Sequence, residues 1–174
     1  MTIALPIPDS YWLLEGQLLA GEYPGAPLHV EVSLNLDLFL SAGIRTFIDL
    51  TQPAEPVTPY SDLLSELASG RGMECRYHRI GFPDHGTPTP KIMSEILRTI
   101  RRELTAHRPV YFHCWGGVGR TGTVAACWLV EQGLSTEDAL ERVSALRFGP
   151  RRLWRRSPET DEQREFVRSW SGNR

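Results

Sequence analysis

Residues 113–122 read His-Cys-Trp-Gly-Gly-Val-Gly-Arg-Thr-Gly, and this stretch decides the fold predicted for the chain. It places Cys114 six positions before Arg120, with a glycine-rich backbone between them. An apolar pair at 111–112 precedes it, and a helix-like apolar run, Val124 to Gln132, follows it. This order is that of a strand, a tight loop and a helix N-terminus. A loop so placed can wrap an oxyanion and bring a thiol against its central atom.

Strand and helix patterns alternate on both sides of this stretch. The expected strands are 11–14, 17–20, 44–50, 75–80 and 109–113, the first two as a hairpin. The expected helices are 30–40, 60–68, 89–106 and 135–146, with a last one opened by Ser157 as N-cap and Pro158 at the first helical position. This alternation predicts an α/β fold with a central, mostly parallel sheet flanked by helices.

In such sheets, ligands bind at the carboxyl ends of the strands. Asp49, the loop after Ile80, and Cys114 all follow expected strands directly. We therefore expect these three places to meet at one edge of the sheet.

Size and composition indicate one domain, residues 1–174, in a reducing, cytoplasmic setting. A net charge of −2 gives no general attraction to nucleic acid or to an anionic membrane. No apolar run approaches the roughly 18 residues of a spanning helix, and residues 1–8 do not resemble a signal peptide. The three cysteines, Cys75, Cys114 and Cys127, are too few and odd in number for a disulfide scaffold. The oligomeric state cannot be read from the sequence.

The side chains at the two ends of the loop carry its chemistry. Cys114 is the candidate nucleophile, because a helix N-terminus, backbone N–H groups and a nearby guanidinium all stabilise a thiolate. Arg120 presents a planar fork that matches two phosphate oxygens. Thr121 can offer its hydroxyl to Cys114 and ease the departure of the thiolate as a leaving group. His113 can hydrogen-bond nearby backbone and hold the loop in shape.

The backbone between these ends forms a candidate phosphate-binding loop. Its residues without a Cβ atom, which let N–H groups turn inward and approach a ligand closely, are Gly116, Gly117 and Gly119. Trp115 and Val118 make the loop apolar between its glycines. We expect the amides of residues 115–119, together with Arg120, to hold the oxygens of a phosphoryl group.

The alternatives to this interpretation are a buried, inert cysteine beside a capping loop, a nucleotide loop or a zinc site. A single cysteine followed by glycines would leave the first alternative open, whereas the full set of residue types in strand–loop–helix order argues against it. A nucleotide loop ends in Gly-Lys-Ser/Thr, and this loop contains no lysine. No histidine or cysteine pair has the spacing of zinc ligands, and we expect neither a metal nor another cofactor.

The pattern His-Cys-x5-Arg-Thr-Gly resembles the signature loop of the protein tyrosine phosphatase superfamily. The short chain and the segment Gly81-Phe82-Pro83-Asp84, about thirty residues before the loop, resemble the small dual-specificity phosphatases. The segment 157–167, Ser-Pro-Glu-Thr-x-x-Gln-x-x-Phe-Val, is similar to that of small bacterial members. The resemblance implies a cysteine-phosphatase fold and hydrolysis of phosphomonoesters through a phosphocysteine intermediate. The implied substrate is phosphotyrosine, with phosphoserine and phosphothreonine as further candidates, in proteins.

The same resemblance assigns Asp84 as general acid, and then as base for the hydrolytic water. Gly81 and Gly86 bound its loop, which could close over bound substrate. The other interpretation is that Asp84 only caps a turn. For Asp49, the competing carboxylate, a structural role at a strand end is favoured, and His85 is expected to face solvent.

Three further features stay open at this level. By resemblance, Gln163 on the last helix could lie near the hydrolytic water, although a solvated surface glutamine is an equal alternative. The five arginines between Arg147 and Arg156 form either a basic rim for acidic sequence or nucleic-acid phosphates, or a solvated loop. Cys75 and Cys127 are most simply core residues, with a role for Cys75 in trapping oxidised Cys114 as the alternative.

The rival functions share parts of this chemistry. They are a phosphatase for small molecules or RNA 5′ ends, a non-catalytic phosphate-binding module, and a sulfurtransferase or arsenate reductase. The expected partner is therefore a phosphorylated protein or a small phosphate ester. The absence of lysine inside the loop argues against a phosphoinositide, because phosphoinositide-preferring relatives often carry one there.

Overall fold

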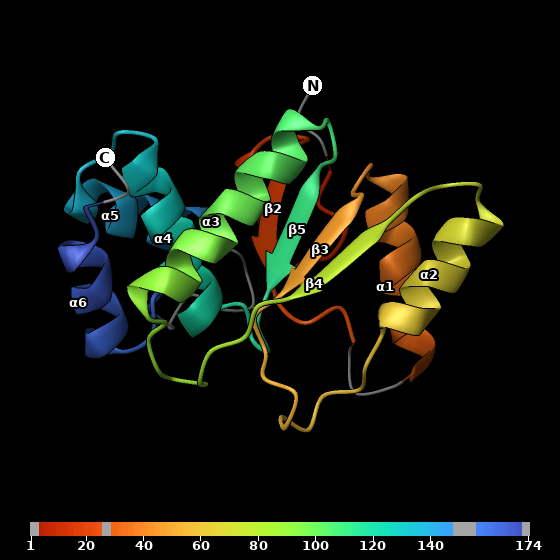
Figure 1. Ribbon diagram of the computed structural model, residues 1–174, viewed down its shortest axis with the longest axis horizontal. Helices are drawn as coiled ribbons and strands as arrows, with labels where there is room; N and C mark the ends of the chain where they lie inside the picture. The colour runs from red at the N-terminus through yellow and green to blue at the C-terminus, as the bar shows by residue number, and fades with distance from the viewer. Residues whose placement is uncertain (1–3, 26–28, 148–155, 172–174) are drawn as a thin grey trace.

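The computed structural model describes residues 4–25, 29–147 and 156–171. Its centre is a five-stranded sheet with the strand order β1-β2-β5-β3-β4 (Figure 1). The strands are β1 (Ser10–Leu14), β2 (Leu18–Gly21), β3 (Thr46–Asp49), β4 (Arg76–Arg79) and β5 (Val110–His113). Strand β1 pairs antiparallel with β2, and all other neighbours are parallel. The predicted α/β class, with its mostly parallel sheet and N-terminal hairpin, is confirmed.

Helices cover both faces of the sheet (Figure 1). On one face lie α1 (His29–Ser41) and α2 (Ser61–Gly70). On the other lie α3 (Pro90–Thr105), α4 (Gly119–Glu131), α5 (Thr136–Leu146) and α6 (Asp161–Ser169). Successive strand residues point to opposite faces, so in β5 Tyr111 joins the core under α1 and α2, whereas Val110 and Phe112 join the other core. Because β5 is buried on both faces, its first three residues are aliphatic or aromatic with no polar alternation, and His113 at its end is buried as well.

The register of the parallel strands brings the expected functional loops to one edge. His113 at the end of β5 pairs with both Asp49 of β3 and Gly21 of β2, and Asp49 pairs with Arg79 of β4. The parallel strands β2, β5, β3 and β4 therefore end at the same edge of the sheet, and the loops that follow them lie next to one another. The expectation from the strand pattern is confirmed.

The same register excludes one sequence-based alternative. Cys75 precedes β4, at the opposite edge, whereas Cys114 follows β5. Along the strand direction, Cys75 lies five residues away from Cys114, which is about 16 Å at the usual rise of a strand. A disulfide needs Cα atoms within about 7 Å of each other. Cys75 is therefore not placed to trap an oxidised Cys114, and it is partly exposed, whereas Cys127 lies in the core as predicted.

The start of the last helix differs from the prediction. Ser157 is not the N-cap, and Pro158 is not at the first helical position. Helix α6 begins at Asp161, and Thr160 caps it in a reciprocal capping box with Gln163. The Ser157 hydroxyl donates instead to the carbonyl oxygen of Val118, 2.7 Å away. A serine-proline pair often starts a helix, but here the Ser157 hydroxyl is bound to Val118 and does not cap α6.

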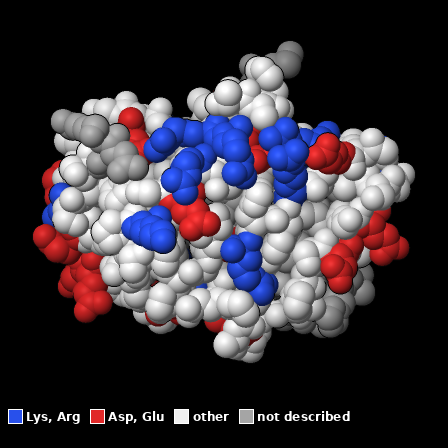
Figure 2. All heavy atoms as spheres, in the orientation of Figure 1, with Lys and Arg blue, Asp and Glu red and all other residues white. Residues whose placement is uncertain are grey.

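Basic side chains gather on the face that carries α3 (Figure 2). Much of their charge is balanced by acidic residues. Arg101 pairs with Glu131, Arg76 pairs with Glu74, and Glu103 lies among several arginines. This surface is therefore a network of ion pairs rather than an unbalanced patch of positive charge.

Glu103, at the C-terminal end of α3, is the buried centre of that network. Its side chain has no exposed surface, and its oxygens lie 2.6 Å from Arg108 Nε and 2.9 Å from Arg102 Nε. Burial alone would raise its pKa, but the hydrogen bonds and charges of Arg108 and Arg102 lower that pKa from 4.5 to about 2. A buried carboxylate held in this way stabilises the fold only while it is ionised.

We therefore expect Glu103→Gln to lower the free energy of unfolding by roughly 2 to 3 kcal/mol at pH 7. Because the folded pKa of Glu103 is depressed, its contribution is complete above about pH 4.5 and disappears as the pH falls toward 2. Urea denaturation of both proteins at pH 7 and at pH 3 measures this, with the exposed Glu95→Gln as control. An equal difference at both pH values would contradict it.

Candidate active site

The loop after β5 holds a cysteine against the first turn of a helix. Strand β5 ends at His113 and α4 begins at Gly119, earlier than the expected apolar run, so Arg120 and Thr121 lie in the first helical turn. The Thr121 hydroxyl lies 3.1 Å from the Cys114 sulfur, and its oxygen accepts the Cys114 amide at 2.9 Å. The thiol therefore has a hydroxyl donor beside it and a helix N-terminus below it.

Neighbouring segments bind the carbonyl groups of this loop. The carbonyl oxygen of Cys114 lies 3.1 Å from His113 Nδ1, that of Trp115 accepts the Tyr23 amide at 2.8 Å, and that of Val118 accepts the Ser157 hydroxyl. Within a peptide unit the N–H points away from the C=O. The amides that share these peptide units therefore point toward the inner side of the loop, as an oxyanion site requires.

Gly117 must be glycine for two independent reasons. Its φ of +64° lies in the left-handed region, which side chains rarely adopt. A Cβ atom there would also lie 2.5 Å from the Gly21 carbonyl carbon and 2.7 Å from the Glu22 nitrogen. The loop after β2 thus presses directly on the loop after β5, and glycine is the residue that permits this approach.

His113 supports the loop from below. Burial, the largest effect, lowers its pKa, so the ring is neutral near pH 7. A neutral ring has one N–H, which Nδ1 donates to the Cys114 carbonyl oxygen, and Nε2 then accepts the hydroxyl of Tyr60 at 2.6 Å. Tyr60 keeps its proton because burial raises its pKa well above 10. The predicted contact of His113 with nearby backbone is present.

The Arg120 guanidinium is completely buried and held by acceptors from two other segments. Its two Nη atoms lie 2.5 and 2.8 Å from the two carboxylate oxygens of Glu55, in the loop after β3. Nη1 also donates to the carbonyl oxygens of Leu50 and Phe82 at 3.2 Å. Its Nε is buried without a hydrogen-bond partner. Glu55 therefore orients the guanidinium, while Nε remains as a donor for a ligand.

Asp84 approaches the same guanidinium from the loop after β4. Its Oδ1 lies 3.1 Å from Arg120 Nη2, although half of the Asp84 side chain is exposed. The expected turn is present, since the Gly86 amide donates to the Pro83 carbonyl oxygen. The Asp84 carboxylate itself faces Arg120 and the exposed ring of His85. Asp84 therefore both belongs to a turn and lies beside Arg120 of the phosphate loop.

Asp49 has the structural surroundings expected of it. It is fully buried, and it accepts hydrogen bonds from Thr51, from the Tyr77 hydroxyl and from Arg79. Burial alone would raise its pKa, but the hydrogen bonds from Thr51 and Tyr77 help to outweigh that effect, and the pKa is lowered. Its oxygens are occupied, so it does not compete with Asp84.

Sequence patterns missed several residues around this site. Glu55, Tyr60 and Ser157 lie in unrelated segments, 39 to 65 residues along the chain from their partners. One signal was available for Glu55, since it lies in a loop that follows a parallel strand at the functional edge. The arginine-rich segment falls on residues 148–155, outside the described residues, apart from its ends.

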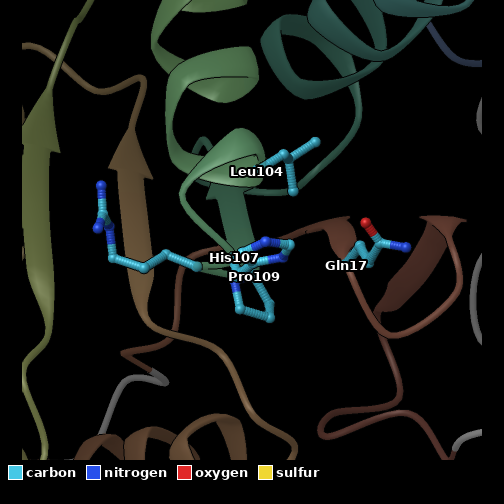
Figure 3. Close-up of a pocket in the computed structure, with 5 residues that line it drawn as sticks. Gln17, Leu104, His107 and Pro109 are labelled. Carbon is cyan, nitrogen blue, oxygen red and sulfur yellow. The ribbon is translucent and has the colours of Figure 1, made fainter.

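A separate pocket of ≈ 350 Å³ lies at the other end of β5 (Figure 3). Gln17, Leu104, His107, Arg108 and Pro109 line it. Residues 107–109 precede β5, so this pocket lies away from Cys114. Among the described residues there is no cluster of three or more His, Cys, Asp or Glu arranged for a metal ion. None of the described helices is both long and apolar enough to cross a membrane.

Comparison with known families agrees with this geometry. A family profile described as "Swiss Army Knife protein, DSP-PTPase phosphatase domain" matches residues 9–167. The chain belongs to this family of phosphatases. It is a small dual-specificity-like member of the protein tyrosine phosphatase superfamily, whose reaction is the hydrolysis of phosphoric monoesters.

Two of the curated relatives are much longer than this chain. It is 28% identical over 135 residues to mouse "Protein tyrosine phosphatase domain-containing protein 1", covering 74% of this chain and 18% of the relative. It is 25% identical over 130 residues to Arabidopsis thaliana "Phosphatidylinositol 3,4,5-trisphosphate 3-phosphatase and protein-tyrosine-phosphatase PTEN1", covering 74% of this chain and 30% of the relative. The chain thus spans less than a third of the length of these two proteins.

Solved structures are similar over nearly the whole chain. The active form of Tk-PTP superposes with a TM-score of 0.69 at 26% identity, covering 94% of this chain and 97% of that one. Kinase associated phosphatase gives 0.69 at 24% identity, covering 86% and 83%. PTPMT1 in complex with PI(5)P gives 0.67 at 19% identity, covering 92% and 94%, which is a likeness of fold.

The contact at Gly117 gives a test of the loop geometry. We expect Gly117→Ala to fold but to lower kcat/KM for nitrophenyl phosphate at least about 100-fold, because a 1 Å displacement of binding groups has effects of that size. Gly72→Ala is the matched control, since Gly72 has nearly the same φ, +65°, but open space around it. In thermal melts Gly72→Ala should lose less stability than Gly117→Ala, because it has the unfavourable φ without the steric overlap. Comparable activity of the two would show that the close approach is unimportant.

Proposed function

We propose that this protein hydrolyses phosphomonoesters through a phosphocysteine intermediate, with Cys114 as nucleophile, Arg120 as phosphate clamp and Asp84 as general acid. The observation that carries the proposal is the convergence of three loops on one point. The thiol has the Thr121 hydroxyl at 3.1 Å, and the buried guanidinium has the Asp84 carboxylate at 3.1 Å. Every role in the reaction is filled by a side chain or a backbone amide of this chain.

In the first step, the Cys114 thiolate attacks phosphorus and forms the S–P bond while the bond from phosphorus to the leaving oxygen breaks. Protonated Asp84 gives its proton to that oxygen. Arg120 and the amides of residues 115–119 hold the three equatorial oxygens throughout. When phosphate binds, its oxygens take the place of Asp84 at Arg120, which frees the carboxyl group for the leaving group.

In the second step, a water molecule attacks phosphorus and gives a proton to the Asp84 carboxylate. The S–P bond breaks, and inorganic phosphate and the thiolate are released. The Thr121 hydroxyl stabilises the departing sulfur by hydrogen bonding. The enzyme returns to its starting state with Asp84 protonated.

For the substrate class we propose phosphotyrosine in proteins. Trp115, next to the nucleophile, is half exposed and presents a large apolar surface beside the phosphate loop. The described carboxylates near Arg120, at Glu55 and Asp84, disfavour ligands with several phosphates. Two structural neighbours, PTPMT1 in complex with PI(5)P and the PP-IP phosphatase SIW14, are only 19% and 16% identical to this chain. Likeness at that level supports the fold and not the substrate.

The nucleophile assignment predicts that Cys114→Ser abolishes turnover of nitrophenyl phosphate and phosphopeptides, because a serine hydroxyl is a far weaker nucleophile here. The wild-type protein should keep its activity in EDTA. The variant should still bind a phosphotyrosine peptide, and more tightly than a phosphoserine peptide or an inositol phosphate, by calorimetry. Full activity of the variant would overturn the mechanism, and preferred binding of the inositol phosphate would overturn the substrate class.

The acid assignment predicts a dependence on the leaving group. Asp84→Asn should lower kcat/KM about 100-fold or more for an alkyl phosphate, whose leaving oxygen needs a proton, and less than about 10-fold for nitrophenyl phosphate. Parallel kinetics on the two substrates measure this difference. Equal losses on both would point to a different general acid.

A further inference from the structure

The segment from Ser157 to Gln163 contacts both the phosphate loop and the loop that carries Asp84. Ser157 donates to Val118 in the phosphate loop, and a Cβ atom on Gly122 would lie 2.1 Å from its hydroxyl oxygen. At the other end of the segment, Gln163 contacts the loop that carries Asp84. This segment is more than 35 residues away from either loop in sequence, so only the fold brings the three together.

Gln163 is completely buried at the junction, in spite of its polar amide. Its Oε1 accepts the amides of Glu159 and Thr160 at 3.1 and 3.2 Å, which completes the capping box. Its Nε2 donates to the Gly86 carbonyl oxygen at 3.1 Å. A Cβ atom on Gly119 would lie 3.0 Å from both of these side-chain atoms, so the amide packs directly on the phosphate loop.

Other contacts join the start of α6 to the loop of Asp84. The Thr160 hydroxyl lies 3.5 Å from the His85 carbonyl oxygen. The His85 ring lies 3.5 Å from Glu159 on one side and 3.5 Å from Asp84 on the other. These contacts are long and exposed, whereas the Gln163 bond is shorter and comes from a fully buried side chain, so it is the stronger restraint.

We propose that Gln163 is a positioning residue that holds the loop of residues 82–86 over the phosphate loop, so that Asp84 reaches the leaving oxygen. This inference rests on the proposed function. It differs from a role beside the hydrolytic water, because Oε1 is already occupied by two backbone amides and Nε2 is bound to Gly86. The packing on Gly119 keeps the amide at a fixed distance from the loop of Cys114.

The variant Gln163→Glu separates this bond from the helix cap. A carboxylate can still accept the amides of Glu159 and Thr160, but it cannot donate to the Gly86 carbonyl oxygen. We measure kcat/KM for an alkyl phosphate and for nitrophenyl phosphate at neutral pH. This parameter reports only the steps up to formation of the phosphocysteine. The ratio of alkyl to nitrophenyl kcat/KM should fall about 10-fold, because misplaced acid harms only the poor leaving group.

The double variant Asp84→Asn/Gln163→Glu tests whether the effect passes through Asp84. Gln163→Glu should produce no further fall in the ratio once the acid is gone, since coupled residues are not additive. Gln132→Ala, an exposed glutamine at the C-cap of α4, is the matched control and should leave the ratio unchanged.

Three results would overturn the inference. In the first, Gln163→Glu lowers kcat/KM equally on both substrates, which indicates a disturbed phosphate loop. In the second, kcat/KM is unchanged while kcat falls and a burst of nitrophenol appears, which indicates a role beside the hydrolytic water. In the third, the ratio falls as far in the Asp84→Asn background. Failure of the proposed function itself is distinguishable, because the wild-type protein would then show no cysteine-dependent turnover.

Discussion

The burial of the Arg120 guanidinium is the constraint on which the rest of the functional edge depends. A charge without exposed surface is unfavourable unless acceptors surround it. Here the acceptors come from the loop after β3, through Leu50 and Glu55, and from the loop after β4, through Phe82 and Asp84. Because burial opposes the charge and Glu55 outweighs that opposition, the pKa of Arg120 stays above its ordinary value. One side chain thus fixes the relative positions of three loops.

The phosphate loop is likewise defined by what lies outside it. Its carbonyl groups are bound by His113, Tyr23 and Ser157, which belong to three different parts of the chain. Turning these carbonyls outward is what turns the amides inward. An oxyanion site of this kind is therefore preorganised by the whole sheet edge, and its amides do not have to turn when the ligand arrives. The proposed position of Gln163, against both Gly119 and Gly86, extends the same arrangement to the loop of the general acid.

Much of the architecture could be predicted because the signals are local. Helix α3 shows apolar residues at helical spacing and has Thr89 and Pro90 at its start, and both features depend only on neighbours in the chain. The glycines after Cys114 are a local signal too, because glycine is the residue that tolerates a positive φ such as that of Gly117. The last helix was placed wrongly at its start for the opposite reason. Two capping signals, Ser157 and Thr160, stand close together, and a contact of Ser157 with a distant loop decided between them.

The sequence by itself determined the α/β class, because strand and helix patterns alternate along the chain. It also determined the family and the candidate nucleophile, clamp and acid at Cys114, Arg120 and Asp84, because two short segments carry these residues. Only the tertiary structure decided that Glu55 orients Arg120, that Cys75 lies far from Cys114, and that Gln163 joins two loops. These relations arise from the order and register of parallel strands, which bring residues from unrelated segments to one edge. A contact across strands leaves no periodicity in the chain, so it becomes visible only when the sheet is assembled.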